Sequence, residues 1–211
     1  MTDPVRESTI DQRIEDLEYI INGDGLRAIQ DAKAKVPSAR LYRVPSIYYN
    51  MPYSWRKESL KAQSEVQLCK TLFFENVLYN GDEDFMEHPH WCRYYAVITQ
   101  YTSKLNTQQL RNFIGYHPGN FNRSVKSNFK LRAVEPETAA ELTGYQFNAH
   151  TVFGMRQPVP IIIDQKVLDI PHSSFFMGGG EVDLKIKVNT REFIEGTGAL
   201  IFNEHELFSK K

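Results

Sequence analysis

A lysine at the start of a hydrophobic segment is the first residue whose type and position suggest chemistry. Lys70 is the second residue of the run CKTLFFENVLY, which begins with Cys69 and spans residues 69–79. Its aromatic and β-branched side chains make this run a strand candidate. A lysine with buried neighbours loses hydration, so it either extends its ammonium to water or serves a site. Lys70 is therefore a candidate functional residue, and a lysine that simply reaches solvent is the alternative.

Three consecutive glycines, Gly178, Gly179 and Gly180, interrupt the strand-like segment FFMGGGEVDLKIKV at residues 175–188. Glycines inside a strand are entropically costly, so they indicate a bulge or a close approach to the backbone. Their exposed N–H groups could bind an oxyanion or a phosphate. The spacing fits neither a Walker A loop nor a dinucleotide fingerprint, which argues against nucleotide binding.

The third segment of interest runs from Gly144 to Gly154, with the sequence GYQFNAHTVFG. It follows a predicted helix and leads to the short apolar strand VPIIID at residues 159–164. Loops next to strand ends commonly line binding sites. A plain connection is the alternative, and His150 within it is either a pocket residue or a loop histidine that faces solvent.

Strands and helices alternate irregularly along the chain, which predicts a mixed α/β fold and not a doubly wound sheet. The first 40 residues are expected to be a helical extension, and residues 41–211 a single domain. Apolar periodicity and capping residues predict helices at 8–21, 26–35, 55–67, 107–114 and 136–142. A further short helix is predicted after Thr190. Strands are predicted at 41–44, 46–50, 69–79, 93–101, 129–134 and 159–164, with a pair in 175–188.

The composition is that of an ordinary globular protein. The 211 residues carry a net charge of −1, so any nucleic-acid surface must be a local patch. Two such patches are predicted, the first from Arg123, Lys126, Lys130 and Arg132, the second from Arg56, Lys57 and Lys61; a solvated face is equally compatible with each. Two cysteines, no secretory signal and no membrane span favour a cytoplasmic protein.

Two other chemistries are less well supported. His88, His90 and Cys92 are possible zinc ligands at every second position. A cluster of three without a fourth ligand is weak evidence for a zinc site, so no metal site is expected. Cys69 could be activated by the adjacent Lys70, but its apolar neighbours favour a buried structural thiol. No Ser-His-Asp or Cys-His arrangement is defensible from the spacing.

Taken together and in this order, three segments resemble the YbaK/prolyl-tRNA synthetase-associated editing domain family. They are CKTLFFEN, ELTGYQFNAHTVFGMRQPVPIIID and FFMGGGEVDLKIKV, and the resemblance extends from about Leu41 to Phe193. Phrases such as YRVPSIYY and GGGEVDLK are most similar to the eukaryotic free-standing branch. The combination is specific, whereas each motif alone is weak.

The resemblance implies a mixed α/β fold around a curved, barrel-like sheet surrounded by helices. It also implies hydrolysis of the ester between a mischarged small amino acid and its tRNA, with no cofactor. Lys70 matches the family lysine that orients the substrate. The substrate-binding residues that the resemblance implies are Thr71, Asn148, Ala149, His150, Thr151, Gly178, Gly179 and Gly180.

The chain departs from the family pattern in its loop. Bacterial members carry Gly-x-x-x-Pro where this chain has Asn148 and Val152, and Gly178 replaces the family serine. The substrate amino acid therefore cannot be carried over. Two alternatives stay open: an inactive module that binds tRNA or aminoacyl-adenosine and docks to a synthetase complex through residues 1–40, and a hydrolase for another small acyl ester or amide.

Overall fold

Strands in the described part of the chain form two sheets, which are joined by one isolated β-bridge and pack on a common core. The computed structural model describes residues 23–81, 89–115 and 129–204. The five-stranded sheet has the order β4-β2-β3-β5-β8, with strands Leu131–Ala133, Cys69–Asn76, Tyr94–Gln100, Ile161–Asp164 and Leu200–Phe202. The three-stranded sheet has the order β1-β7-β6, with strands Arg40–Arg43, Leu184–Asn189 and Ser174–Gly178. The two sheets touch through a parallel bridge between Leu68 and Phe176.

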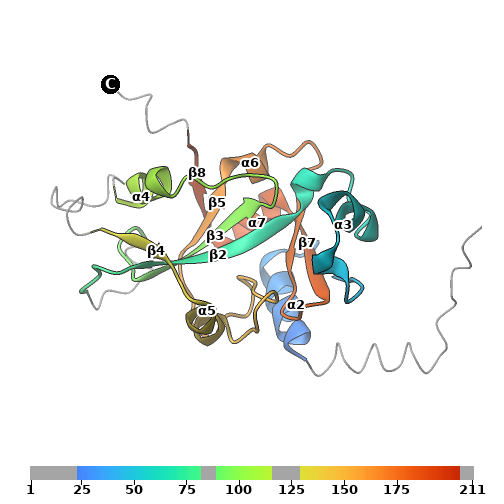
Figure 1. Ribbon diagram of the computed structural model, residues 1–211, viewed down its shortest axis with the longest axis horizontal. Coiled ribbons are helices and arrows are strands. Elements are labelled where there is room, and N and C mark those ends of the chain that lie inside the picture. The colour runs from blue at the N-terminus through green and yellow to red at the C-terminus, as the bar shows by residue number, and fades with distance from the viewer. Residues whose placement is uncertain (1–22, 82–88, 116–128, 205–211) are drawn as a thin grey trace, which may run out of the picture.

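Pairing within the larger sheet is mixed. Strands β4, β2 and β3 are antiparallel neighbours, whereas β3, β5 and β8 run parallel to one another. The smaller sheet is antiparallel throughout. This arrangement confirms the predicted mixed α/β fold (Figure 1).

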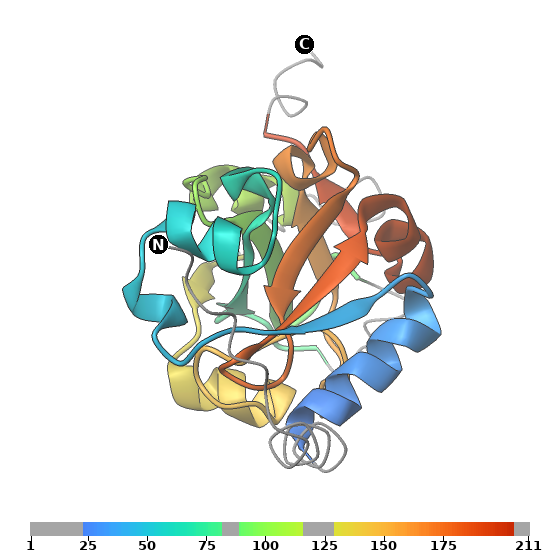
Figure 2. The ribbon, with the colours of Figure 1, turned by 90° about the vertical axis from the view of Figure 1, so that its right-hand side faces the viewer.

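Helices and short 3₁₀ turns cover both sheets. The α-helices are α2 (Asp24–Lys35), α3 (Tyr53–Ser59), α4 (Thr107–Gly115), α5 (Pro136–Thr143), α6 (Gln165–Leu168) and α7 (Thr190–Thr197), and the 3₁₀ helices are η1 (Tyr48–Asn50) and η2 (Glu65–Gln67). In Figure 2 the three-stranded sheet faces the viewer, with α2 and α7 on one side and the η1–α3 segment on the other. Within the described ranges, no helix is long and apolar enough to cross a membrane.

Both faces of the smaller sheet are buried, each against a different core. Phe175 and Met177 of β6 enter the main core, while Phe176 between them joins a second cluster with Tyr48 and Leu68. This follows from the alternation of side chains along a strand. The second cluster is built by η1 and α3, so the segment before β2 covers the outer face of β6 and β7.

Most predicted elements are confirmed, and the exceptions have local causes. Residues 46–50 were expected to form a strand but turn into η1, because Pro45 and Pro52 flank them and the Tyr48 N–H bonds back to the Pro45 carbonyl at 2.9 Å. The helix expected over 55–67 is divided into α3 and η2. The short elements α6 and β8 gave no sequence signal, and the helix expected at 8–21 lies outside the described residues.

Helix α2 belongs to the main core. Its residues Ala28, Ile29 and Ala32 are buried there, and Val36 follows them at the helix end. The boundary predicted at residue 40 stays a prediction, but a deletion that tests it has to spare α2. Removing residues 24–40 would expose this apolar face of the main core.

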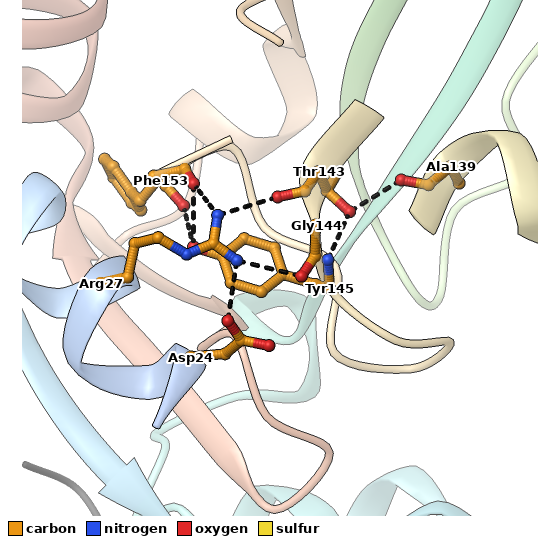
Figure 3. A network of polar contacts seen from close by, with 8 residues as sticks. Asp24, Arg27, Ala139, Thr143, Gly144, Tyr145 and Phe153 are labelled. Atoms are coloured by element: carbon orange, nitrogen blue, oxygen red, sulfur yellow. Dashed lines mark hydrogen bonds and ion pairs between the residues drawn. The ribbon is translucent and has the colours of Figure 1, made fainter. Parts of the chain in front are cut away.

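Arg27 of α2 fastens the segment between α5 and residue 154. Its guanidinium donates to the carbonyls of Thr143 and Gly144, each at 3.0 Å, and to that of Gly154. It also lies 4.0 Å from the centre of the Tyr145 ring. Figure 3 shows these contacts, with Asp24 holding the guanidinium from the helix side at 2.9 Å. A planar, five-donor group is required to reach several carbonyls at once.

We predict that Arg27→Met destabilises the protein by about 2–4 kcal/mol, because it leaves several partly buried carbonyls without their donor. Urea denaturation measures this. Arg191→Met is the matched control, since the Arg191 side chain is exposed and, among the described residues, pairs with Glu195 of its own helix. Equal unfolding midpoints for the two variants would contradict the assignment of Arg27 as the anchor.

Candidate active site

A cavity of about 230 Å³ opens where strands β2 and β6 separate. The strands touch at the Leu68–Phe176 bridge. Two residues further along each parallel strand lie Lys70 and Gly178, and both line the cavity. The strands therefore form a fork whose open end faces η1 and the loop that follows α5. Figure 1 shows β2 next to the sheet that contains β7, and the fork itself is defined by β2 and β6.

Five of the residues predicted from the sequence share this cavity. Lys70, Thr71, Asn148, His150 and Gly178 all line it. They come from β2, from the loop after α5 and from β6, so residues more than 100 positions apart meet at one place. Their role in substrate binding stays a prediction, but the geometry that this role requires is present.

The other predicted substrate-binding residues lie behind the cavity wall. Ala149 and Thr151 are fully buried. The Gly179 N–H donates to the Leu184 carbonyl at 3.0 Å, and the Gly180 N–H donates to the Ala149 carbonyl at 3.1 Å. The expectation that these two N–H groups are exposed for an oxyanion is therefore corrected. The Gly179 N–H closes the turn between β6 and β7, and the Gly180 N–H holds the loop that follows α5.

Gly178 is required by the loop that packs on it. A Cβ at this position would collide with the backbone carbonyl of His150. The absence of a side chain lets the loop lie directly on β6, which brings His150 to the cavity. This contact explains in physical terms why the serine of the family pattern has no room here.

Asn148 has the backbone conformation that a glycine would favour. Its φ is +67°, in the left-handed region that asparagine tolerates better than most residues. This fits the alignment of Asn148 with the glycine of the family pattern. The Tyr49 hydroxyl of η1 donates to the Asn148 carbonyl at 2.6 Å and holds this strained turn in place.

Two residues of the cavity wall carry buried polar atoms with no partner among the described residues. They are Thr71 Oγ1 and His150 Nε2. Burial lowers the pKa of His150, and a hydrogen bond to the Tyr145 backbone only partly opposes this. With Nε2 unpartnered, the bond to Tyr145 belongs to Nδ1, so the neutral ring offers Nε2 as an acceptor.

The cavity wall is basic. It contains Lys70 and Lys185, and among the described residues that line it there is no aspartate or glutamate. Lys70 lies 5.9 Å from the centre of the Tyr101 ring. A cavity with two ammonium groups and no carboxylate favours an anion or a developing negative charge.

Lys185 is the charged residue of the cavity wall that sequence reasoning missed. In LKIKV, Leu184, Ile186 and Val188 alternate toward the main core, so the lysines between them are expected to face solvent. Lys187 is partly exposed, whereas Lys185 is buried because η1 covers it. The run of tyrosines at 48–49 was the available signal, but it was assigned to a strand.

The predicted tRNA-contact residues lie elsewhere or cannot be placed. Arg123 and Lys126 lie outside the described residues. Arg132 on β4 pairs with Glu75 at 2.9 Å, and Lys130 precedes this strand. Glu75 is five positions from Lys70 along β2, which separates Arg132 from the cavity by about 16 Å.

In the second predicted patch, Arg56 makes hydrogen bonds within the protein. Arg56 donates to the carbonyls of Tyr49 and Met51, at 2.7 and 2.8 Å. Its guanidinium also lies over tyrosine rings at 5.1 to 5.6 Å. Arg56 therefore stabilises the η1–α3 segment, and its role in tRNA binding stays a prediction.

The cysteine prediction concerns a residue of the cavity wall, since Cys69 lines the cavity beside Lys70. Burial raises the pKa of Cys69 well above its usual value, as expected for a structural thiol. Within the described residues, no three His, Cys, Asp or Glu side chains gather as a metal site would require. His88 lies outside those residues.

Comparison with known proteins agrees with this geometry. A model of the aminoacyl-tRNA editing domain matches residues 57–195, about two thirds of the chain. No curated protein sequence gives a significant match.

Solved structures of low sequence identity share the fold. A protein described as a candidate trans-editing enzyme for prolyl tRNA synthetase superposes with a TM-score of 0.64 at 16% identity, covering 85% of this chain and 95% of its own. The hypothetical protein APE2540 gives 0.59 at 19% identity, covering 83% and 96%. A scaffold from computational epitope grafting gives 0.62 at 15% identity, covering 85% and 95%. With the family match spanning both the lysine strand and the glycine-rich strand, the chain belongs to the aminoacyl-tRNA editing domain family.

Proposed function

We propose that this protein is a free-standing aminoacyl-tRNA deacylase that hydrolyses the ester bond of a tRNA mischarged with a small amino acid. One observation carries the proposal: Lys70 and Gly178 face the same basic cavity at the fork between β2 and β6. Membership of the editing domain family and the fold shared with a candidate trans-editing enzyme support it.

The cavity matches the size of the proposed acyl group. A volume of about 230 Å³ is below the roughly 300–1,000 Å³ typical of drug-sized sites. A small amino acid fits such a space, while the bulk of a tRNA has to remain outside. The exposed Phe147, at the cavity wall, lies at the boundary between the two.

Ester hydrolysis places negative charge on the carbonyl oxygen as water attacks. The Lys70 ammonium is the charged group of β2 that can stabilise this oxyanion or orient the terminal ribose and phosphate. His150 Nε2 is a neutral acceptor that can bind the α-ammonium of the aminoacyl group. No side-chain nucleophile is needed, because a positioned water attacks the ester.

The direct test is a deacylation screen with purified full-length protein. The substrates are tRNAs carrying alanine, serine, cysteine, threonine or proline, and release of the amino acid is measured. Cleavage of at least one mischarged tRNA is expected. Failure on all five, combined with cleavage of a small acyl ester, would instead favour the alternative hydrolase.

We predict that Lys70→Ala lowers kcat by at least about 100-fold, the typical loss when one oxyanion donor is removed. The thermal midpoint should stay close to wild type because Lys70 is only partly buried. Lys33→Ala on the exposed face of α2 is the control and should keep full activity. Normal turnover by Lys70→Ala would refute the deacylase assignment.

We predict that deacylation activity no longer falls at low pH when His150 is replaced by phenylalanine. The ring has to be neutral for Nε2 to accept, and burial lowers the pKa of His150 below its ordinary value of 6.5. Wild-type activity should therefore fall only below pH 6.5, as the ring gains its proton. His150→Phe should raise KM about tenfold through the lost hydrogen bond and show no such fall. A KM unchanged by the substitution would contradict this role.

We further propose that the N-terminal segment, residues 1–40, docks the protein to an aminoacyl-tRNA synthetase or its complex. Since α2 within this segment is part of the core, a deletion of residues 1–22 is the suitable variant. It should retain deacylation of free mischarged tRNA and lose co-purification with a synthetase. An inactive full-length protein that still co-purifies would support the binding-module alternative.

A further inference from the structure

Lys185 places a buried ammonium against the cavity. The residue is only 4% exposed. Its Nζ donates to the Val182 carbonyl at 2.9 Å, to the Leu184 carbonyl at 3.1 Å and to the Tyr49 hydroxyl at 3.0 Å. It also lies 4.7 Å from the centre of the Tyr49 ring. These contacts join β7 to η1 at the cavity wall.

The number of protons shows which form of Lys185 this geometry requires. Two partners of Nζ are carbonyls, which only accept. The third, the Tyr49 hydroxyl, gives its own proton to the Asn148 carbonyl at 2.6 Å, so it also accepts from Nζ. Three acceptors need three N–H donors, which an ammonium has and a neutral amine lacks. The chain of hydrogen bonds therefore runs from the charged Lys185 through Tyr49 to Asn148.

We propose that Lys185 is a positioning residue for the proposed deacylation, because its ammonium, acting through the Tyr49 hydroxyl, holds the backbone of Asn148 and with it the substrate loop. The proposal rests on the proposed function for its effect on catalysis. The hydrogen-bond chain itself is independent of that function. Among the hydrogen bonds of the described residues, Lys185 reaches the Asn148 carbonyl through Tyr49, whereas Lys70 faces the cavity from β2.

Burial is the main reason why Lys185 titrates near neutrality. Burial and the nearby charge of Arg56 in α3 lower its pKa, Asp183 raises it, and the result is a pKa of about 7. Asp183 is itself paired with Arg43 of β1 at 3.0 Å, which weakens its help. The remaining titratable groups that face Lys185 are the phenols of Tyr48 and Tyr49. Tyr101 is a further hydrogen-bond partner of the Tyr49 hydroxyl, and it lines the same cavity as Lys70.

Loss of the proton rearranges the chain. A neutral amine keeps two N–H donors for the two carbonyls and turns its lone pair toward Tyr49. The Tyr49 hydroxyl then donates to Nζ and leaves the Asn148 carbonyl. Because Asn148 is held at a φ of +67°, release of this bond lets the loop relax away from the cavity.

The experiment compares Lys185→Met, Tyr49→Phe and the control Lys187→Met over a range of pH. The first readout is stability, by urea denaturation between pH 6 and 10. The unfolded chain keeps the lysine proton up to about 10.5 and the folded protein loses it at about 7. Between these values the unfolded state binds more protons, so this group makes stability rise with pH.

The dependence of stability on pH should distinguish Lys185→Met from the other two variants. Lys185→Met is expected to lose the rise with pH, because the titrating group is gone. Tyr49→Phe and Lys187→Met should keep it, since Lys185 is still buried in both. A rise in Lys185→Met as large as in wild type would overturn the assignment of the buried proton.

The dependence of kcat/KM on pH should group Tyr49→Phe with Lys185→Met instead. Above pH 7 the wild type and Lys187→Met should lose kcat/KM as Asn148 is released. Lys185→Met and Tyr49→Phe should start about tenfold lower, the effect of one lost hydrogen bond, and lack this alkaline limb. A limb from the substrate's own amino group is common to all four proteins. Tyr49→Phe with a wild-type alkaline limb would refute the relay through the hydroxyl.

A third readout does not depend on catalysis. The backbone amide resonances of Asn148 and Ala149 should shift between pH 6 and 8.5 in the wild type and stay fixed in Tyr49→Phe. If no tRNA is cleaved but these resonances shift, the deacylase proposal fails and the relay stands. If tRNA is cleaved and the resonances do not shift, the relay fails and the deacylase stands.

Discussion

The whole site depends on two strands that pair at one point and then separate. After the bridge between Leu68 and Phe176, no strand continues the pairing between β2 and β6. The space between them is lined by Lys70 on one side and Gly178 on the other. A continuous sheet would fill this space with backbone hydrogen bonds. The division into two sheets is therefore what leaves room for a ligand inside a mixed α/β fold.

Burial of cations close to this fork sets its electrostatics. Lys185 loses almost all of its hydration, and three acceptors with a tyrosine ring only partly compensate. Arg56, stacked among tyrosines on the same side, adds to the positive potential. An uncompensated positive potential is costly in the free protein, and an anionic group or a developing oxyanion would relieve it.

The sequence predicted the fold well where local pattern and tertiary packing agree. Strand β2 and helix α5 were predicted close to their observed bounds, because aromatic content marks the strand while Pro136 and Gly144 mark the helix ends. It failed where the environment overrides the pattern. The aromatic residues 46–50 suit a strand, but two prolines and the second core make η1 of them.

The site was predictable in part for the same reason. Lys70 and Gly178 have unusual residue types for their positions, so they were noticed from the sequence alone. Lys185 was not, because a lysine at an alternating position of an amphipathic strand is ordinary. Only the packing of η1 on the outer face of β7 makes it a buried cavity residue, and that packing is a long-range property.

The loop between α5 and β5 contains no regular structure at residues 144–154, yet it is fixed along much of its length. Arg27 holds the carbonyls at both of its ends. Tyr49 holds Asn148 in the middle, and the Gly180 N–H holds Ala149 beside it. The ends are thus fixed by an arginine that stays charged at any physiological pH, and the middle by a lysine whose charge is lost near neutrality. This difference confines any response to pH to the part of the loop that faces the cavity, while its attachment to the core stays unchanged.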